Sequence, residues 1–161
     1  MIIKTEPSDI FKQNAKHIAF AINTEGFNDS GFAGEIARTA WPELANIGNN
    51  EIGEVLSKQV GDTTYHALVC HSLHNGWGTN QREVIKTCFD KIDANNEPIN
   101  SIAIGTGFIG QLSGANVPEI VCGMLDSKQK IILHANFSLD DINKYYKSHP
   151  CTENPKTFIR K

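Results

Sequence analysis

The chain has 161 residues, a length that one domain with a single apolar core can account for. Its 15 basic and 18 acidic side chains give a formal net charge of −3 and form no long run of like charge, which argues against nucleic acid as a partner. No stretch approaches the roughly 18 apolar residues that span a bilayer, and the N-terminus lacks the apolar run of a signal peptide. We therefore expect one soluble, cytoplasmic domain over residues 1–161, without a membrane partner.

Five short apolar runs bounded by turn signals predict largely buried strands. They cover residues 2–6, 17–23, 66–72, 101–105 and 130–135. Over residues 53–70, two strand-like runs joined by Gly61 and Asp62 predict a β-hairpin.

Helical patterns lie between these strands. They cover residues 30–41, 79–92, 115–125 and 138–147. Ser138 is a good N-cap for the last of them, with Asp141 three residues further on. Because strands alternate with helices, we expect an α/β fold with a mixed, mainly parallel sheet that has helices on both faces.

The cysteines and histidines indicate neither a metal nor a redox centre. The four cysteines are widely scattered: Cys70, Cys88, Cys122 and Cys151. No CxxC spacing occurs, so we expect reduced, mostly buried thiols. His71 and His74 lie close together but lack a second ligand pair, and we therefore predict no metal site and no cofactor.

Two glycine loops follow predicted strands, and neither fits a standard nucleotide motif. The GxGxxG from Gly105 to Gly110 has too little chain after it for a complete doubly wound sheet, and the next strand has no acidic residue for a ribose. Gly26 and Gly31 have P-loop spacing, but Phe32 and Ala33 replace the required lysine and hydroxyl. Either the backbone amides of these loops bind an anion such as a diphosphate, or the glycines only form tight turns.

Four stretches in order resemble the macro domain family, which binds ADP-ribose. Ser8-Asp9-Ile10 is similar to the family's Gly-Asp-Ile, and the segment over 20–37 is similar to its NAAN strand end and following glycine loop. The helix over 80–92 and the stretch IAIGTGFIGQLSGAN over 102–116 complete the resemblance. It implies a three-layer α/β/α macro domain in which the GxGxxG is a phosphate loop.

The resemblance also implies a set of site residues. Asp9 would accept from the adenine amino group, and Asn23 would hold the distal ribose, the sugar remote from the adenine. Ligand contacts are expected from Asp9, Ile10, Asn23, Ser30, Gly31, Phe32, Gly105, Thr106, Gly107, Phe108, Ile109 and Gly110. The expected catalytic residues are Asn23, Asp29 and Glu25, with one of the two carboxylates orienting water.

Two functions follow from the resemblance. The first is binding of ADP-ribose with hydrolysis of a derivative, either ADP-ribose 1″-phosphate or an ADP-ribosyl or acyl linkage at the distal ribose. The second is a non-catalytic reader or sponge of ADP-ribose, of an ADP-ribosylated macromolecule or of a nucleotide derived from NAD. Departures bear on this choice, because Phe20 replaces the first asparagine of NAAN and Asn28 stands where hydrolytic relatives often carry histidine. For Phe27, Phe32 and Phe108, both ring stacking and core packing remain open.

Overall fold

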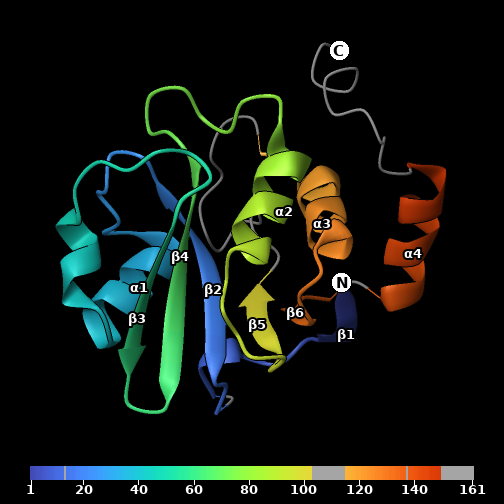
Figure 1. The fold of residues 1–161 in the computed structure, drawn as a ribbon, viewed down its shortest axis with the longest axis horizontal. Coiled ribbons are helices and arrows are strands. Elements are labelled where there is room, and N and C mark those ends of the chain that lie inside the picture. The colour runs from blue at the N-terminus through green and yellow to red at the C-terminus, as the bar shows by residue number, and fades with distance from the viewer. Residues whose placement is uncertain (13, 103–114, 137, 150–161) are drawn as a thin grey trace.

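A six-stranded sheet forms the centre of the molecule (Figure 1). The computed structural model describes residues 1–12, 14–102, 115–136 and 138–149. The strands are β1 (Ile2–Glu6), β2 (His17–Asn23), β3 (Val55–Val60), β4 (Thr63–His71), β5 (Ile99–Ile102) and β6 (Ile131–His134). Their order across the sheet is β1-β6-β5-β2-β4-β3.

Five of these strands run parallel, and β3 alone pairs antiparallel, with β4. The predicted hairpin is therefore confirmed, with Val60 opposite Thr63 across the turn. β4 begins three residues earlier than the apolar run indicated, because Thr63 to Tyr65 pair with β3 while remaining half-buried. β5 begins at Ile99, two residues earlier than expected.

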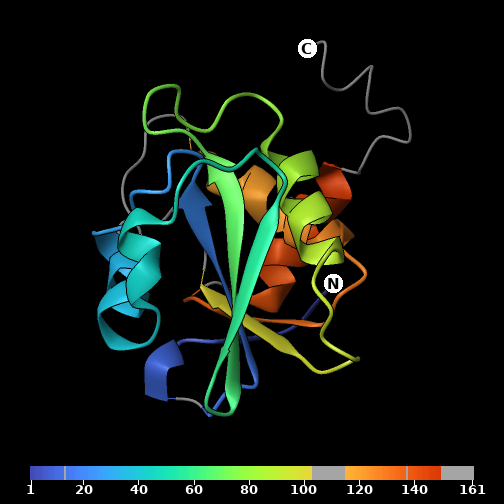
Figure 2. The ribbon, with the colours of Figure 1, turned by 60° about the vertical axis from the view of Figure 1, so that its left-hand side comes forward.

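Helices cover both faces of the sheet (Figure 2). One face carries α1 (Gly31–Thr39), and the other carries α2 (Gln81–Asp90), α3 (Val117–Asp126) and α4 (Leu139–Ser148). Two short 3₁₀ helices, η1 (Ile10–Lys12) and η2 (Pro42–Asn46), were not expected from the sequence. Ser138 caps α4 as predicted, since its Oγ accepts from the Asp141 amide at 3.1 Å.

Alternation along the central strands builds a separate apolar core on each face. In β2, Phe20 and Ile22 pack with Phe32 of α1, whereas Ala19 packs with the α2–α3 side. β4 divides in the same way, with Val69 on the α1 side and Leu68 on the other. Such two-sided burial explains why these strands read as continuous apolar runs. The expected three-layer, mainly parallel α/β fold is confirmed.

A buried ion pair joins the helices on the α2–α3 face. Arg82 donates to both carboxylate oxygens of Asp126, at 2.6 and 3.0 Å, and both side chains are about 95% buried. Tyr146 of α4 donates to the same carboxylate at 2.6 Å, and Arg82 also donates to the His149 carbonyl. This network links α4 to α2 and α3. Within the described chain, no helix is long and apolar enough to cross a membrane.

Candidate functional site

The carboxyl ends of the parallel strands meet at one edge of the sheet, where ligands of open α/β sheets bind. Besides Glu6 of β1, four residues end strands at this edge: Asn23 of β2, His71 of β4, Ile102 of β5 and His134 of β6. All four line one of two neighbouring cavities.

Asn23 organises the loop that follows β2. Its Oδ1 accepts from the amides of Gly26 at 2.8 Å and Phe27 at 3.1 Å, and its Nδ2 donates to the Phe27 carbonyl at 2.7 Å. An amide group has two N–H donors, so one of them stays available for a ligand. Gly26 takes a φ of +80°, and a Cβ there would lie 2.1 Å from the Gly48 carbonyl oxygen. The loop therefore requires both an amide at position 23 and glycine at 26.

Asn28 and Asp29 continue this loop with opposite environments. Asn28 is buried, accepts from the Asn23 amide and donates to the Leu44 carbonyl at 3.1 Å. Asp29 is exposed, and its backbone carbonyl accepts from the Arg38 side chain at 3.4 Å. The Asp29 carboxylate is therefore the group of the two that is free to act on a ligand or on water.

The N-terminus of α1 follows directly. Ser30 is the N-cap, and its side chain makes no capping hydrogen bond. The helix begins at Gly31 with a φ of +64°, and Gly34 is the first residue whose amide donates to a carbonyl one turn earlier, that of Ser30 at 3.0 Å. The amides before it have no acceptor within the helix. The N–H groups and the dipole of such a terminus attract negative charge.

The first cavity, which we call the Asn23 pocket, has a volume of about 180 Å³. Its lining residues come from the end of β2, the loop after it, the start of α1 and the end of β4: Ala21, Asn23, Phe27, Asn28, Asp29, Ser30, Gly31, Phe32, Ala33, His71 and Leu73. None of these is Lys or Arg, so within the described lining the only charged side chain is a carboxylate.

The second cavity, which we call the Asp9 cleft, has a volume of about 540 Å³. It is lined by Ser8, Asp9, Ile10, Phe11, Phe32, Glu35, Ile102 and His134. The Phe11 ring stacks on Phe32 with centroids 4.9 Å apart, which leaves one aromatic face partly open to the cleft. Asp9 Oδ1 accepts from the Phe11 amide at 2.9 Å, so its second oxygen is available to a ligand. Because Phe32 lines both cavities, they adjoin at the start of α1.

The Glu25 carboxylate is hydrogen-bonded to a neighbouring loop. The Leu73 amide donates to its Oε1 at 2.9 Å, and the Ser72 hydroxyl donates to its Oε2 at 2.8 Å. These hydrogen bonds, the Leu73 amide first, lower the pKa of Glu25 to about 2. Glu25 does not line either cavity and instead fixes the turn after β4.

Of the eight expected site residues that the structure describes, seven lie around two adjoining cavities. Asp9 and Ile10 line one, Asn23, Asp29, Ser30 and Gly31 line the other, and buried Phe32 lines both. Phe27 is 54% exposed beside the Asn23 pocket and is not a core residue. The expected contacts from Gly105, Thr106, Gly107, Phe108, Ile109 and Gly110 lie outside the described residues.

The lining residues that were missed from the sequence include Phe11, His71 and His134. Each was accessible to a simple rule, because His71 and His134 end parallel strands and Phe11 directly follows the Asp9-Ile10 pair. His134 contacts the Ser8 carbonyl through Nδ1 at 3.2 Å and the Asn100 side chain through Nε2 at 2.8 Å, which holds the loop that carries Asp9.

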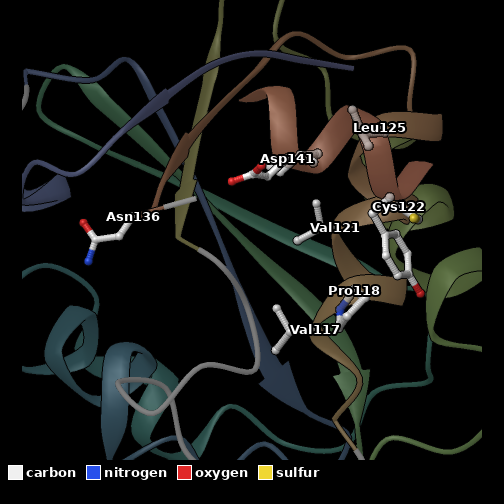
Figure 3. Close-up of a pocket in the computed structure, with 9 residues that line it drawn as sticks. Val117, Pro118, Val121, Cys122, Leu125, Asn136 and Asp141 are labelled. Carbon is white, nitrogen blue, oxygen red and sulfur yellow. The ribbon is translucent and has the colours of Figure 1, made fainter. Parts of the chain in front are cut away.

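A third cavity, of about 260 Å³, lies between α3 and α4 (Figure 3). Apolar side chains such as Val121 and Leu125 dominate it, and Asp141 is the one charged side chain in its described lining. Its described lining lacks the convergent polar groups of the two cavities at the strand ends. Within the described chain, no three His, Cys, Asp or Glu side chains gather as a metal site, and Cys70, Cys88 and Cys122 are buried thiols.

No protein-family model and no curated protein matches the sequence. Solved structures do match it in fold. The macrodomain of Mycobacterium tuberculosis DarG superposes with a TM-score of 0.62 at 12% identity, over 83% of this chain and 96% of that one. A structure of three main domains of coronavirus nonstructural protein 3 superposes with a TM-score of 0.63 at 12% identity, over 90% of this chain and 36% of that one.

A structure described as alphavirus P23pro-zbd also matches, with a TM-score of 0.59 at 12% identity. The match covers 90% of this chain but only 23% of the longer alphavirus chain. Identity this low establishes the fold alone. The strand order, the two helical layers and these superpositions agree, and we conclude that the chain has the macro domain fold.

Proposed function

We propose that the protein binds ADP-ribose, or a derivative of it, across the two adjoining cavities. The observation that carries this proposal is the position of the α1 N-terminus, whose Phe32 lines both cavities and whose first amides have no helical acceptor. An extended ligand with a negative centre and an uncharged group at each end matches this arrangement.

The Asp9 cleft suits the adenine end. It offers an aromatic surface from Phe11 on Phe32 and a carboxylate oxygen that is not used within the loop. An exocyclic amino group donates to such an oxygen, whereas the carbonyl of hypoxanthine would face it with a second acceptor. The smaller Asn23 pocket, about a third of the volume of the cleft, suits a sugar rather than a base.

The test replaces one carboxylate oxygen of Asp9 with an NH₂ group. Asp9→Asn keeps an acceptor for the Phe11 amide but turns the ligand-facing oxygen into a donor. We expect the parent to bind ADP-ribose more tightly than the inosine analogue, and Asp9→Asn to weaken ADP-ribose by roughly 5- to 150-fold, which corresponds to about 1–3 kcal/mol. The inosine analogue should lose less or gain. Calorimetric titration of both ligands measures this, and equal affinities for them in both proteins would contradict the assignment of the cleft.

Hydrolysis of the bound derivative is the second candidate function, and the Asp29 carboxylate in the Asn23 pocket favours it. A carboxylate that faces the distal sugar orients water for attack there, with ADP-ribose 1″-phosphate or an ADP-ribosyl linkage as substrate. Asp29→Asn should then lower the single-turnover rate by about 10² to 10⁴ without weakening ADP-ribose binding. A parent protein that binds ADP-ribose but turns over no derivative would be a reader.

A further inference from the structure

His71 is a buried side chain with a ring nitrogen that no described residue hydrogen-bonds. It ends β4, is only 6% exposed and lines the Asn23 pocket. Its Nδ1 has no hydrogen-bond partner among the described residues, although its backbone carbonyl accepts from the Thr24 amide at 2.8 Å. Leaving a buried polar atom unpaired costs on the order of 1–3 kcal/mol, so such an atom needs an explanation.

The described neighbours of the imidazole pack against the ring but make no hydrogen bond to its Nδ1. The Trp77 ring packs against it with centroids 5.1 Å apart, and Glu25 fixes the turn at Ser72 and Leu73 that follows. Burial lowers the pKa of His71 to about 4 despite the nearby Glu25 carboxylate, so the ring is neutral at pH 7. A neutral imidazole offers one donor and one acceptor, and rotation about χ2 exchanges its nitrogens with ring carbons while the ring stays in place.

We propose that His71 is a ligand-binding residue that hydrogen-bonds a hydroxyl group of the sugar in the Asn23 pocket. This inference rests on the proposed function and deepens it, because it names the residue that distinguishes a ligand with a distal sugar from one that ends in phosphate. The free N–H of Asn23 lines the same pocket and supplies a second contact to that sugar.

The charge of the pocket favours a hydroxyl over a phosphate. A hydroxyl both donates and accepts, which matches a neutral imidazole in either orientation. A phosphate beside His71 would face a neutral ring and the Asp29 carboxylate, and the described lining offers no Lys or Arg side chain to offset that charge. The diphosphate is better placed beside the N-terminus of α1, which leaves His71 for the sugar beyond it.

The first experiment compares ADP-ribose with ADP, which ends where the distal sugar would begin. His71→Phe keeps an aromatic ring against Trp77 and removes both nitrogens, whereas His71→Gln restores a donor and an acceptor. We expect His71→Phe to raise the Kd of ADP-ribose about tenfold and to change that of ADP less than twofold, with His71→Gln in between. His66→Gln is the matched control, because His66 is a buried histidine of the same strand that lines neither cavity, and it should leave both Kd values unchanged.

A second measurement needs no substitution. In ¹H–¹⁵N spectra of the imidazoles, ADP-ribose should shift the ring nitrogens of the parent's His71, and ADP should leave them in place. If the parent binds neither ligand, the proposed function fails. If it binds both while His71→Phe weakens both equally or neither, or if both ligands give the same ¹⁵N shift, the function stands and the role of His71 is wrong.

Discussion

The three side-chain hydrogen bonds of Asn23 make a quantitative prediction. Asn23→Ala removes the acceptor of the Gly26 and Phe27 amides and the donor to the Phe27 carbonyl. Each bond contributes about 1 kcal/mol net, and the exposed Phe27 backbone regains water, so the free energy of unfolding should fall by about 2–3 kcal/mol. The same loop carries Asp29 to the pocket, so ADP-ribose affinity should fall as well.

Asn23→Asp separates the effect on stability from the effect on ADP-ribose affinity. It keeps the acceptor but places a carboxylate oxygen 2.7 Å from the Phe27 carbonyl oxygen and adds a charge to the pocket. Stability should fall by about 1–2 kcal/mol, while ADP-ribose affinity falls at least as far as in Asn23→Ala because a second carboxylate repels the diphosphate.

Urea unfolding followed by circular dichroism measures the stability, and the m-value should stay unchanged because the fold is retained. Asn14→Ala is the control, since Asn14 is exposed, and its free energy of unfolding should stay within about 0.5 kcal/mol of the parent. An Asn23→Ala protein as stable as this control would refute the view that Asn23 organises the loop.

Two further predictions concern pH and a glycine. Burial, and next His17, lower the pKa of His66 to about 4 from an ordinary value near 6.5, so the unfolded chain binds a proton that the folded chain does not between these pH values. The contribution of His66 to stability is thus complete above pH 6.5 and is lost as the pH falls towards 4, by up to about 3 kcal/mol. Urea unfolding at pH 7.5, 6.5, 5.5 and 4.5 should show this loss. A free energy of unfolding that does not change with pH would contradict it. Gly26→Ala should lower the free energy of unfolding by at least about 2 kcal/mol, because the new Cβ would lie 2.1 Å from the Gly48 carbonyl oxygen. Gly61→Ala is the control and should cost about 1 kcal/mol, because Gly61 also has a positive φ but lies in open space. Equal costs of the two substitutions in thermal unfolding would show that the Gly26 contact is relieved.

Elements with local signals were predictable from the sequence. The two-sided burial of β2 and β4 made their apolar runs recognisable, and Ser138 with Asp141 marked the start of α4. The Asp9-Ile10 pair and the loop from Asn23 to Gly31 were also recognised, because each has a local motif.

Properties that depend on distant contacts were not predictable. Glu25 was expected to orient water, yet its partners Ser72 and Leu73 lie 47 and 48 residues away. The unpaired state of His71 depends on the packing of Trp77 and on its position at the pocket, neither of which has a local signature. The stacking of Phe11 on Phe32 depends on the turn η1, which only the folded chain reveals.

Backbone amide NMR of the parent protein titrated with ADP-ribose tests the central claim most directly. If the ligand spans both cavities, shifts should concentrate at residues 9–11, 23–33 and 71–73, which come from three separate parts of the chain. The far ends of β3 and β4, around residues 58–63, should stay unchanged and serve as the internal control. No shift at millimolar ADP-ribose, or shifts confined to the cavity between α3 and α4, would contradict the account.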